Sequence, residues 1–272
     1  MVKKRSQIYG DEIDNKIIEY YKDYYKTTLG LPNWDFLSKQ RLNEEEIYCS
    51  RYINRIKQWI DVDFKGLRVL VVGSGTGGEL VNFHNEGAEV YGIEPYSQAM
   101  DICKLKAEVA GISNKSLKIC SAEDIDFEDS FFDFVYCFTV IEHVEDVNKS
   151  ISEMIRVTKQ KGHIFIQAPD YRQLYEGHYK LPLPMFLPNF INKVILKILR
   201  RPTGFLNTLN KVTSVSIRKI LENYDVISLK VHEKQDKRDS SKVSTKLIFF
   251  IQDLIYQLFD APLNQVWLIR KK

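Results

Sequence analysis

The sequence predicts an α/β fold built on a doubly wound, mainly parallel sheet, and three observations point to this class. Between residues 61 and 168, short apolar segments typical of buried strands alternate with segments of helical periodicity. The first apolar segment ends in four glycines within Gly73–Gly78, which is typical of a tight turn between a strand and a helix. The same alternation resumes after residue 212. Strict alternation indicates right-handed βαβ units with helices on both faces of one sheet.

The first 60 residues precede this alternation. Helical spacing at 11–26 and again at 43–60 predicts two helices around a turn at 29–34. We therefore expect residues 1–60 to form a helical extension that flanks the core.

The elements of the core at 61–168 follow in order. Apolar and aromatic runs predict strands at 67–72, 88–95, 114–122, 131–141 and 163–169. Helical spacing, ended by glycine in two cases, predicts helices at 79–87, 97–112 and 147–162. In an open sheet of this kind, ligands bind at the carboxyl ends of the strands, near the point where the strand order reverses.

Residues 169–212 break the alternation and are called the cap segment below. They are rich in proline and aromatic residues and predict one helix, at about 189–200. Eight basic residues and no acidic one lie between residues 177 and 221. The predicted helix carries Ile191, Val194, Ile195, Ile198 and Leu199 on one face and basic residues mainly on the other. It either lies on an anionic membrane surface, covers a phosphate-bearing substrate, or packs on the core with a solvated basic face.

The last part of the chain, 213–272, returns to the core sheet. A helix is predicted at 213–224, a strand at 225–233, a mostly apolar helix at 244–259 and a final strand at 264–272. The four predicted parts are therefore 1–60, 61–168, 169–212 and 213–272.

The composition fits a globular, cytoplasmic protein. The chain has 39 Lys and Arg against 36 Asp and Glu, a net charge of +3, and 44% hydrophobic residues, which disfavours disordered, collagen-like and strongly basic nucleic-acid-binding classes. The sequence shows neither a membrane-spanning apolar run nor a signal-peptide pattern. The four cysteines are scattered singly, so we expect free thiols and no metal site.

The glycine turn predicts a nucleotide-type ligand, because glycines let a ligand approach the backbone and a helix N-terminus offers unpaired N–H groups. Gly73, Gly75 and Gly78 also satisfy GxGxxG, and Glu94 lies where a dinucleotide site places its ribose-binding acid. This motif alone leaves a nicotinamide dinucleotide and a compact adenosyl ligand both open. An acid after the third strand, within Ser121–Asp124, can accept a hydrogen bond from an adenine amino group and favours the adenosyl ligand.

Three segments in this order, VLVVGSGTGG, YGIEP and SAEDIDFEDSFFDFVYCFTVIEHV, resemble the class I S-adenosylmethionine-dependent methyltransferases over about residues 60–170. The resemblance implies S-adenosyl-L-methionine as cofactor and a Rossmann-like sheet of seven strands with the last strand, 264–272, antiparallel. It also implies cofactor-binding roles for the residues that match the family's motifs: Gly73, Gly75, Gly77, Glu94, Ala122, Glu123, Phe138 and Thr139. One position departs from the family, since Val71 stands where an acid often contacts the polar tail of the cofactor.

Two histidines are candidates for the base that removes a proton from a hydroxyl acceptor. His143 follows the fourth strand, at the carboxyl edge of the sheet where the acceptor would lie. His178 follows the fifth strand, in the cap segment, and is expected over the same pocket, among Tyr175, Glu176 and Tyr179, which we expect to contact the substrate. Each histidine also has a purely structural interpretation.

The sequence therefore predicts an S-adenosylmethionine-dependent methyltransferase that O-methylates a small-molecule or glycan acceptor, such as a phosphate- or lipid-carrier-linked sugar of surface-polysaccharide biosynthesis. The basic cap segment would contact an anionic carrier or the inner face of a membrane, and nucleic acid is disfavoured. Two alternatives stay open, a non-catalytic partner that keeps the cofactor-binding fold and an NAD-dependent oxidoreductase.

Overall fold

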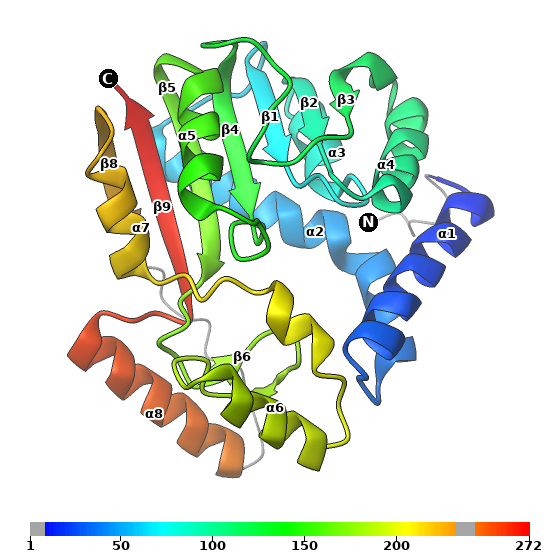
Figure 1. Ribbon diagram of the computed structural model, residues 1–272. Helices are drawn as coiled ribbons and strands as arrows, with labels where there is room; N and C mark the ends of the chain where they lie inside the picture. The colour runs from blue at the N-terminus through cyan, green and yellow to red at the C-terminus, as the bar shows by residue number, and fades with distance from the viewer. Residues whose placement is uncertain (1–8, 232–242) are drawn as a thin grey trace.

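The computed structural model describes residues 9–231 and 243–272, and it confirms the predicted sheet (Figure 1). Seven strands form one sheet in the order β3-β2-β1-β4-β5-β9-β8, in which β9 runs antiparallel to both of its neighbours. The strands are β1 (Arg68–Val72), β2 (Glu89–Ile93), β3 (Leu117–Lys118), β4 (Phe132–Phe138), β5 (Thr158–Pro169), β8 (Val226–Val231) and β9 (Asn264–Lys271). The last two residues of the predicted strand 225–233 lie outside the described residues.

Helices cover both faces of this sheet because its strands alternate their apolar side chains between two cores. Leu70 and Val72 point to the core beneath the helices at 147–157 and 214–221, whereas Val69 and Val71 point to the core beneath the helices at 34–60, 78–85 and 97–110. The helices are α1 (Asp11–Lys22), a π-helical turn (Asp23–Thr28), α2 (Trp34–Ile60), α3 (Gly78–Asn85), α4 (Ser97–Ala110), α5 (Val147–Val157), α7 (Ser214–Leu221) and α8 (Val243–Phe259). The N-terminal helical extension is confirmed, although α2 begins nine residues before the predicted start at residue 43.

Two predicted core elements end in different places. The helix predicted at 147–162 ends at Val157, because Thr158 turns into extended backbone and donates its hydroxyl to the Met154 carbonyl at 2.6 Å. Residues 158–162 instead lengthen β5. The strand predicted at 114–122 shrinks to Leu117–Lys118, since only these two residues pair with β2 before the chain leaves the sheet edge.

The cap segment covers the carboxyl ends of β4 and β5, as Figure 1 shows. It contains a two-stranded hairpin, β6 (Tyr175–Glu176) and β7 (Leu181–Pro182), then helix α6 (Asn189–Ile198) and a 3₁₀ turn (Gly204–Thr208). Its start is anchored to the C-terminal part of the chain by Arg172. This guanidinium contacts buried Asp170 at 2.6 Å, the Ser214 hydroxyl at 2.6 Å and the Asp260 carbonyl at 3.0 Å.

Helix α6 does not pack as its periodicity predicts. Asn192 and Leu196 are its buried residues, and Val194, Ile198 and Leu199 are at least half exposed. The interpretation of an apolar face packed on the core is therefore wrong for these three side chains. Other residues of the cap segment also bind the rest of the chain, since Arg201 donates to the Gly30 carbonyl and Asn210 donates to the carbonyls of Glu142 and Val144.

The loop between β3 and β4 is held by a cluster of ion pairs and hydrogen bonds around Arg156. Its guanidinium forms two hydrogen bonds with Glu153, at 2.8 and 2.7 Å, and donates to the carbonyls of Ile125 and Phe127. The Ile125 N–H donates to Glu153 at 2.9 Å. Arg156, aided by the Ile125 N–H, lowers the pKa of Glu153 below its ordinary value of 4.5.

This cluster predicts an acid-sensitive contribution to stability. A carboxyl whose pKa is lowered by folding stabilises the protein above its unfolded pKa, and that contribution disappears as the pH falls through the folded pKa. Glu153→Gln should therefore lower the free energy of unfolding by about 1 kcal/mol at neutral pH and by much less at about pH 3. Urea unfolding of both proteins at the two pH values measures this, and an equal difference at both would contradict the assignment.

Candidate functional site

The glycine turn lies at the carboxyl end of β1 and packs against the turn that follows β4. Gly73, Gly75 and Gly77 have positive φ angles of 66°, 50° and 89°, which other residues rarely adopt. A Cβ atom on Gly73 would lie 2.3 Å from Val140 Cγ2, whereas one on Gly75 would meet no atom within 4 Å. The first glycine therefore brings two segments together, and the second leaves space for a ligand at the backbone.

Glu94 joins the end of β2 to this turn. Its carboxylate accepts hydrogen bonds from the Gly75 N–H at 3.0 Å and the Tyr96 N–H at 3.1 Å. Burial raises the pKa of Glu94 although both N–H donors act to lower it. A carboxylate has about four acceptor positions, so Glu94 can still accept from two hydroxyl groups of a ligand. The predicted glycines and Glu94 thus form one site.

The N-terminal extension covers the same turn, a contact that the sequence did not indicate. The Tyr21 hydroxyl of α1 lies 3.3 Å from the Thr76 hydroxyl, inside the glycine turn, and accepts a hydrogen bond from Arg41 Nε of α2 at 3.1 Å. Val71, the position of the missing acid, is buried in β1. Tyr21 and Arg41 therefore bring polar and positive groups to a turn that lacks the usual acid.

Tyr21→Phe should lower the affinity for S-adenosylhomocysteine about fivefold, because one hydrogen bond that fixes Thr76 contributes about 1 kcal/mol. Calorimetric titration measures the change. Tyr20→Phe is the matched control, since Tyr20 packs edge-on against Tyr21 at 5.2 Å and belongs to the same helix. If Tyr21→Phe and Tyr20→Phe bind S-adenosylhomocysteine with equal affinity, the Tyr21 hydroxyl does not contribute to the ligand site.

The other predicted cofactor residues lie at the same edge but differ in their contacts. Ala122 is buried, and the Glu123 carboxylate accepts from the backbone N–H groups of Glu145 and Asp146, at 2.5 and 3.2 Å. The Phe138 ring packs on Tyr52 of α2, with ring centroids 4.7 Å apart. Thr139 is exposed, has a positive φ of 51° and donates its N–H to Gln167 of β5. Their roles toward a cofactor stay predictions.

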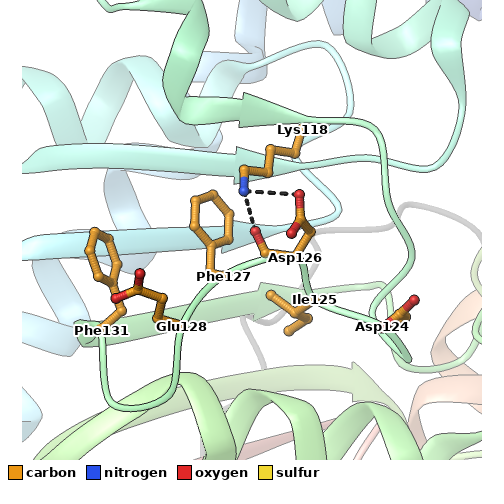
Figure 2. Close-up of a pocket in the computed structure, with 7 residues that line it drawn as sticks. All are labelled: Lys118, Asp124, Ile125, Asp126, Phe127, Glu128 and Phe131. Atoms are coloured by element: carbon orange, nitrogen blue, oxygen red, sulfur yellow. Dashed lines mark hydrogen bonds and ion pairs between the residues drawn. The ribbon is translucent and has the colours of Figure 1, made fainter.

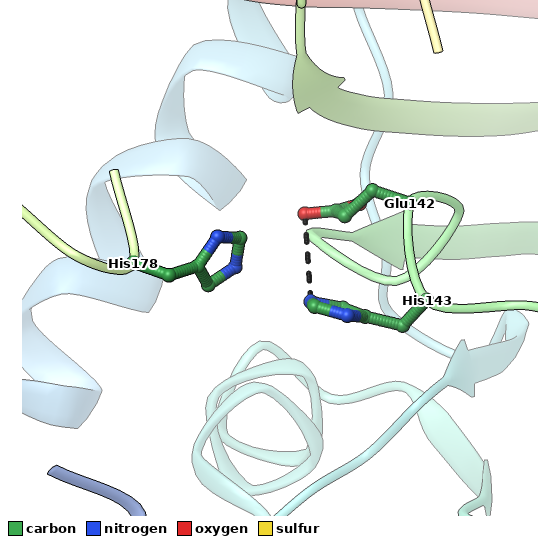
Figure 3. Close-up of side chains that lie close together, drawn as sticks. All are labelled: Glu142, His143 and His178. Atoms are coloured by element: carbon green, nitrogen blue, oxygen red, sulfur yellow. Dashed lines mark ion pairs between the residues drawn. The ribbon is translucent and has the colours of Figure 1, made fainter. Parts of the chain in front are cut away.

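The two candidate histidines come together, and Glu142 joins them (Figure 3). The His143 and His178 rings lie edge to face, with centroids 5.0 Å apart, and His143 Nε2 lies 3.9 Å from Glu142 Oε1. Glu142 and His143 belong to the turn after β4, where the His143 N–H donates to the Val140 carbonyl. His178 comes from the hairpin turn of the cap segment. Because Val140 also contacts Gly73, this cluster lies directly beside the glycine turn.

Burial sets the charge state of each member of this cluster. Burial lowers the pKa of His143 to about 3, and the neighbouring His178 charge adds to this, so His143 is a neutral ring near pH 7. His178 Nδ1 lies 2.6 Å from Glu176 Oε1. Despite burial, this pair raises the pKa of His178 and lowers that of Glu176. Burial raises the pKa of Glu142 to about 7.

Aromatic side chains from two segments enclose one side of the cluster. Phe205 of the 3₁₀ turn lies 5.7 Å from the His143 ring and 5.1 Å from the His178 ring, and it also contacts Tyr24 of the N-terminal extension. Burial raises the pKa of Tyr24 well above its ordinary value. No local pattern predicts that residues so far apart in the chain meet, because only tertiary packing brings them together.

The predicted substrate residues divide into two kinds. Glu176 is fully buried and holds His178, while its second oxygen accepts the Tyr179 N–H at 2.7 Å. Tyr179 is also fully buried, and its hydroxyl donates to the Pro202 carbonyl at 2.8 Å. Tyr175 is half buried and pairs with Pro182 in the hairpin. Glu176 and Tyr179 therefore shape the site, and direct substrate contact stays a prediction for all three residues.

A separate hollow of about 650 Å³ lies beneath the loop after β3 (Figure 2). Lys118 Nζ spans it with a 2.9 Å ion pair to Asp126, above the Phe127 ring. Asp124, at the end of the segment expected near adenine, lines it, but none of the eight predicted cofactor-binding residues does. The chemistry-bearing groups lie instead at the glycine turn and the histidine cluster, so we assign no role to this hollow.

With this geometry established, comparison with known proteins identifies the domain type. Residues 70–166 match the family described as "Methyltransferase domain". The uncharacterized methyltransferase YcgJ of Bacillus subtilis is 30% identical over 136 residues, which are 50% of this chain and 49% of that protein. A ubiquinone biosynthesis O-methyltransferase of Pectobacterium atrosepticum is 27% identical over 38% of this chain and 43% of its own. The chain thus spans about half the length of these curated relatives.

Solved structures share the fold over most of the chain. The YcgJ crystal structure has a TM-score of 0.55 at 19% identity and covers 82% of this chain and 98% of its own. A SAM-dependent methyltransferase from Archaeoglobus fulgidus has a TM-score of 0.53 at 22% identity and covers 87% and 99%. No helix within the described residues is long and apolar enough to cross a membrane.

Proposed function

We propose that this chain, which contains a class I S-adenosylmethionine-dependent methyltransferase domain, O-methylates a small-molecule or glycan acceptor. The observation that carries the proposal is the placement of Glu142, His143 and His178 directly beside the glycine turn, through the Gly73–Val140 contact. The name of the ubiquinone biosynthesis relatives supports transfer to oxygen. Neither alternative, a nicotinamide-dependent oxidoreductase or a non-catalytic partner, has support from the comparisons.

The residues at the glycine turn fit the cofactor. Space at Gly75 admits a ligand against the backbone, and Glu94 offers acceptor positions for ribose hydroxyls. Tyr96, two residues after Glu94, is 67% exposed and offers an aromatic face for the adenine ring. When bound, S-adenosylmethionine supplies an electrophilic methyl group on a sulfonium, so the chain's own task is positioning and exclusion of water.

The histidine cluster supplies what a hydroxyl acceptor needs. Such an acceptor must lose its proton at or after attack, and a neutral imidazole within hydrogen-bond reach can accept it. His143 is held neutral by burial, and the ion pair with Glu176 fixes the orientation of the His178 ring. The aromatic enclosure by Phe205 and Tyr24 limits water around both rings. An amine acceptor would not require this arrangement.

Methyl transfer from labelled S-adenosylmethionine tests the proposal. The purified chain is incubated with panels of hydroxylated acceptors, including carrier-linked sugars and phenols, and with matched amines. We expect label in O-methyl products and calorimetric binding of S-adenosylhomocysteine. Transfer only to amines would overturn the choice of oxygen. Tight binding of S-adenosylhomocysteine without methyl transfer to any acceptor of either panel would favour the non-catalytic partner.

The cap segment further suggests that the acceptor is presented at an anionic membrane surface, as it would be on a lipid carrier. Phe190, Val194 and Ile198 form an exposed stripe along α6, with exposed fractions of 68%, 53% and 76%. Lys197 and Arg200 are exposed beside this stripe. An apolar stripe flanked by basic residues matches the interior and the headgroups of an anionic bilayer.

Vesicle co-sedimentation tests this surface. We expect binding to phosphatidylglycerol vesicles that weakens with salt, and little binding to neutral phosphatidylcholine vesicles. Val194→Ser with Ile198→Ser should weaken binding about 30-fold, since each exposed apolar side chain contributes roughly 1 kcal/mol on insertion. Val215→Ser on α7, an equally exposed valine outside the cap segment, is the control. Equal loss in both would contradict a role for α6.

A further inference from the structure

Glu142 presents an unusual combination of complete burial and missing partners. Its side chain is 0% exposed, and neither carboxylate oxygen has a hydrogen-bond partner. A buried carboxylate without a hydrogen-bond partner is unfavourable, because the neighbouring His178 charge offsets its desolvation only in part. Nearly all buried polar groups in native proteins are paired. Such a group therefore points to a binding partner outside the chain.

Two of the groups close to Glu142, the rings of His143 and His178, offer nitrogen ligands. A carboxylate oxygen of Glu142 and one ring nitrogen each from His143 and His178 all lie within 4.8 Å of one another. His143 Nε2 and Glu142 Oε1 are 3.9 Å apart, while two ligands of a tetrahedral ion with bonds of about 2.1 Å lie roughly 3.4 Å apart. Figure 3 shows the His178 ring turned toward the gap between Glu142 and His143. A small side-chain adjustment brings all three atoms to ligand distance.

The hairpin prepares His178 for this role. Glu176 lies 2.6 Å from Nδ1 of His178, which leaves Nε2 as the nitrogen free to bind an ion. The Tyr179 N–H fixes the other oxygen of Glu176 at 2.7 Å. Histidines that bind metal ions usually donate their second ring N–H to a carboxylate, which orients the ring and increases its basicity. Glu176 is therefore a positioning residue for His178.

We propose that Glu142, His143 and His178 bind a divalent transition-metal ion, and that Zn²⁺ or an ion of similar preference fits them best. Two imidazoles and one carboxylate suit Zn²⁺ and Fe²⁺, whereas Mg²⁺ prefers a set of oxygen ligands. The sequence-based expectation of no metal site rested on the scattered cysteines. These three ligands lie in two segments that only the fold brings together.

Three protein ligands leave at least one position open on the ion. This consequence rests on the proposed function: an acceptor hydroxyl bound there would become more acidic and release its proton to water before methyl transfer. The ion would then take over the role of a ring base and also orient the acceptor oxygen. Binding of the ion itself does not depend on turnover.

Metal titration of the full, metal-stripped chain tests the site. We expect one Zn²⁺ per chain at micromolar or lower concentration, a visible Co²⁺ spectrum typical of mixed nitrogen and oxygen ligands, and no competition by Mg²⁺ at similar concentration. Glu142→Gln keeps the size of the side chain, and His143→Ala removes a partly exposed ring. Each should weaken Zn²⁺ binding about 100-fold or more, and Glu176→Gln about 10-fold or more.

Two controls separate this site from other zinc-binding groups. His84→Ala removes a histidine of α3, and Cys120→Ser removes the one half-buried free thiol, so both should bind Zn²⁺ as the unaltered chain does. S-adenosylhomocysteine titration shows that each variant folds and tests the proposed function separately. Failure of the unaltered chain to bind Zn²⁺, or unchanged binding in Glu142→Gln and His143→Ala, overturns the metal site even where S-adenosylhomocysteine binds.

Discussion

Gly73→Ala should reduce the affinity for S-adenosylhomocysteine about 100-fold or more and lower the free energy of unfolding by about 3 kcal/mol. The new Cβ atom would lie 2.3 Å from Val140 Cγ2, so the glycine turn or the turn after β4 must move. The φ of 66° adds left-handed strain of about 1–2 kcal/mol. Overpacking adds about 1–3 kcal/mol. Urea unfolding and calorimetric titration measure the two losses.

Gly111→Ala is the matched control for this substitution. Gly111 ends α4 with a φ of 76°, but a Cβ atom there meets nothing within 4 Å. It should lose only about 1 kcal/mol of stability and keep its affinity for S-adenosylhomocysteine. If both variants behave alike, strain alone explains Gly73, and the contact with Val140 does not position the ligand site.

The sheet and its glycine turn were predictable because both follow from local patterns. β1 and β4 are mostly buried and contain the apolar runs 69–72 and 134–138, and four clustered glycines between a strand and a helix have few other interpretations. Element ends were less predictable. The polar residues 158–161 look like a helix end carrying lysines, yet they form the start of β5. Backbone pairing with Phe132 decides this, and it does not appear in a local pattern.

The candidate site was only half visible in the sequence. His143 and His178 were expected at the same pocket, but the sequence did not indicate that their rings contact each other. Glu142 stands beside His143, but nothing in the sequence shows that it is buried without a hydrogen-bond partner. Tyr21 reaches the glycine turn from the N-terminal extension, outside the segment that resembles known enzymes. Helix α6 shows a different limit of sequence patterns. Its periodicity reveals an apolar face, but it does not show whether the rest of the chain covers that face.

His178→Asn tests whether the histidine cluster drives turnover. Asparagine is smaller than histidine, but its amide nitrogen stands near the place of Nδ1 and can donate to Glu176, so the hairpin should keep its shape. The S-adenosylhomocysteine affinity should stay within about twofold, because His178 belongs to the cap segment and not to the glycine turn. Turnover should fall about 10²- to 10⁴-fold, whether the ring accepts the acceptor proton itself or binds an ion that makes the acceptor more acidic.

Two further variants show whether a loss of turnover in His178→Asn reflects the reaction or only the structure. Glu176→Gln removes the charge that orients the His178 ring and should lower kcat about 10- to 100-fold, with a smaller change in KM. His84→Ala should leave both constants unchanged, since His84 lies in α3, outside the cluster. If the cluster is purely structural, substitutions in it should instead lower the free energy of unfolding and the cofactor affinity together. Turnover per folded molecule would then be preserved. Full turnover in His178→Asn would show that His178 takes no part in the reaction. Cofactor binding would then be the one function of the chain that these variants support.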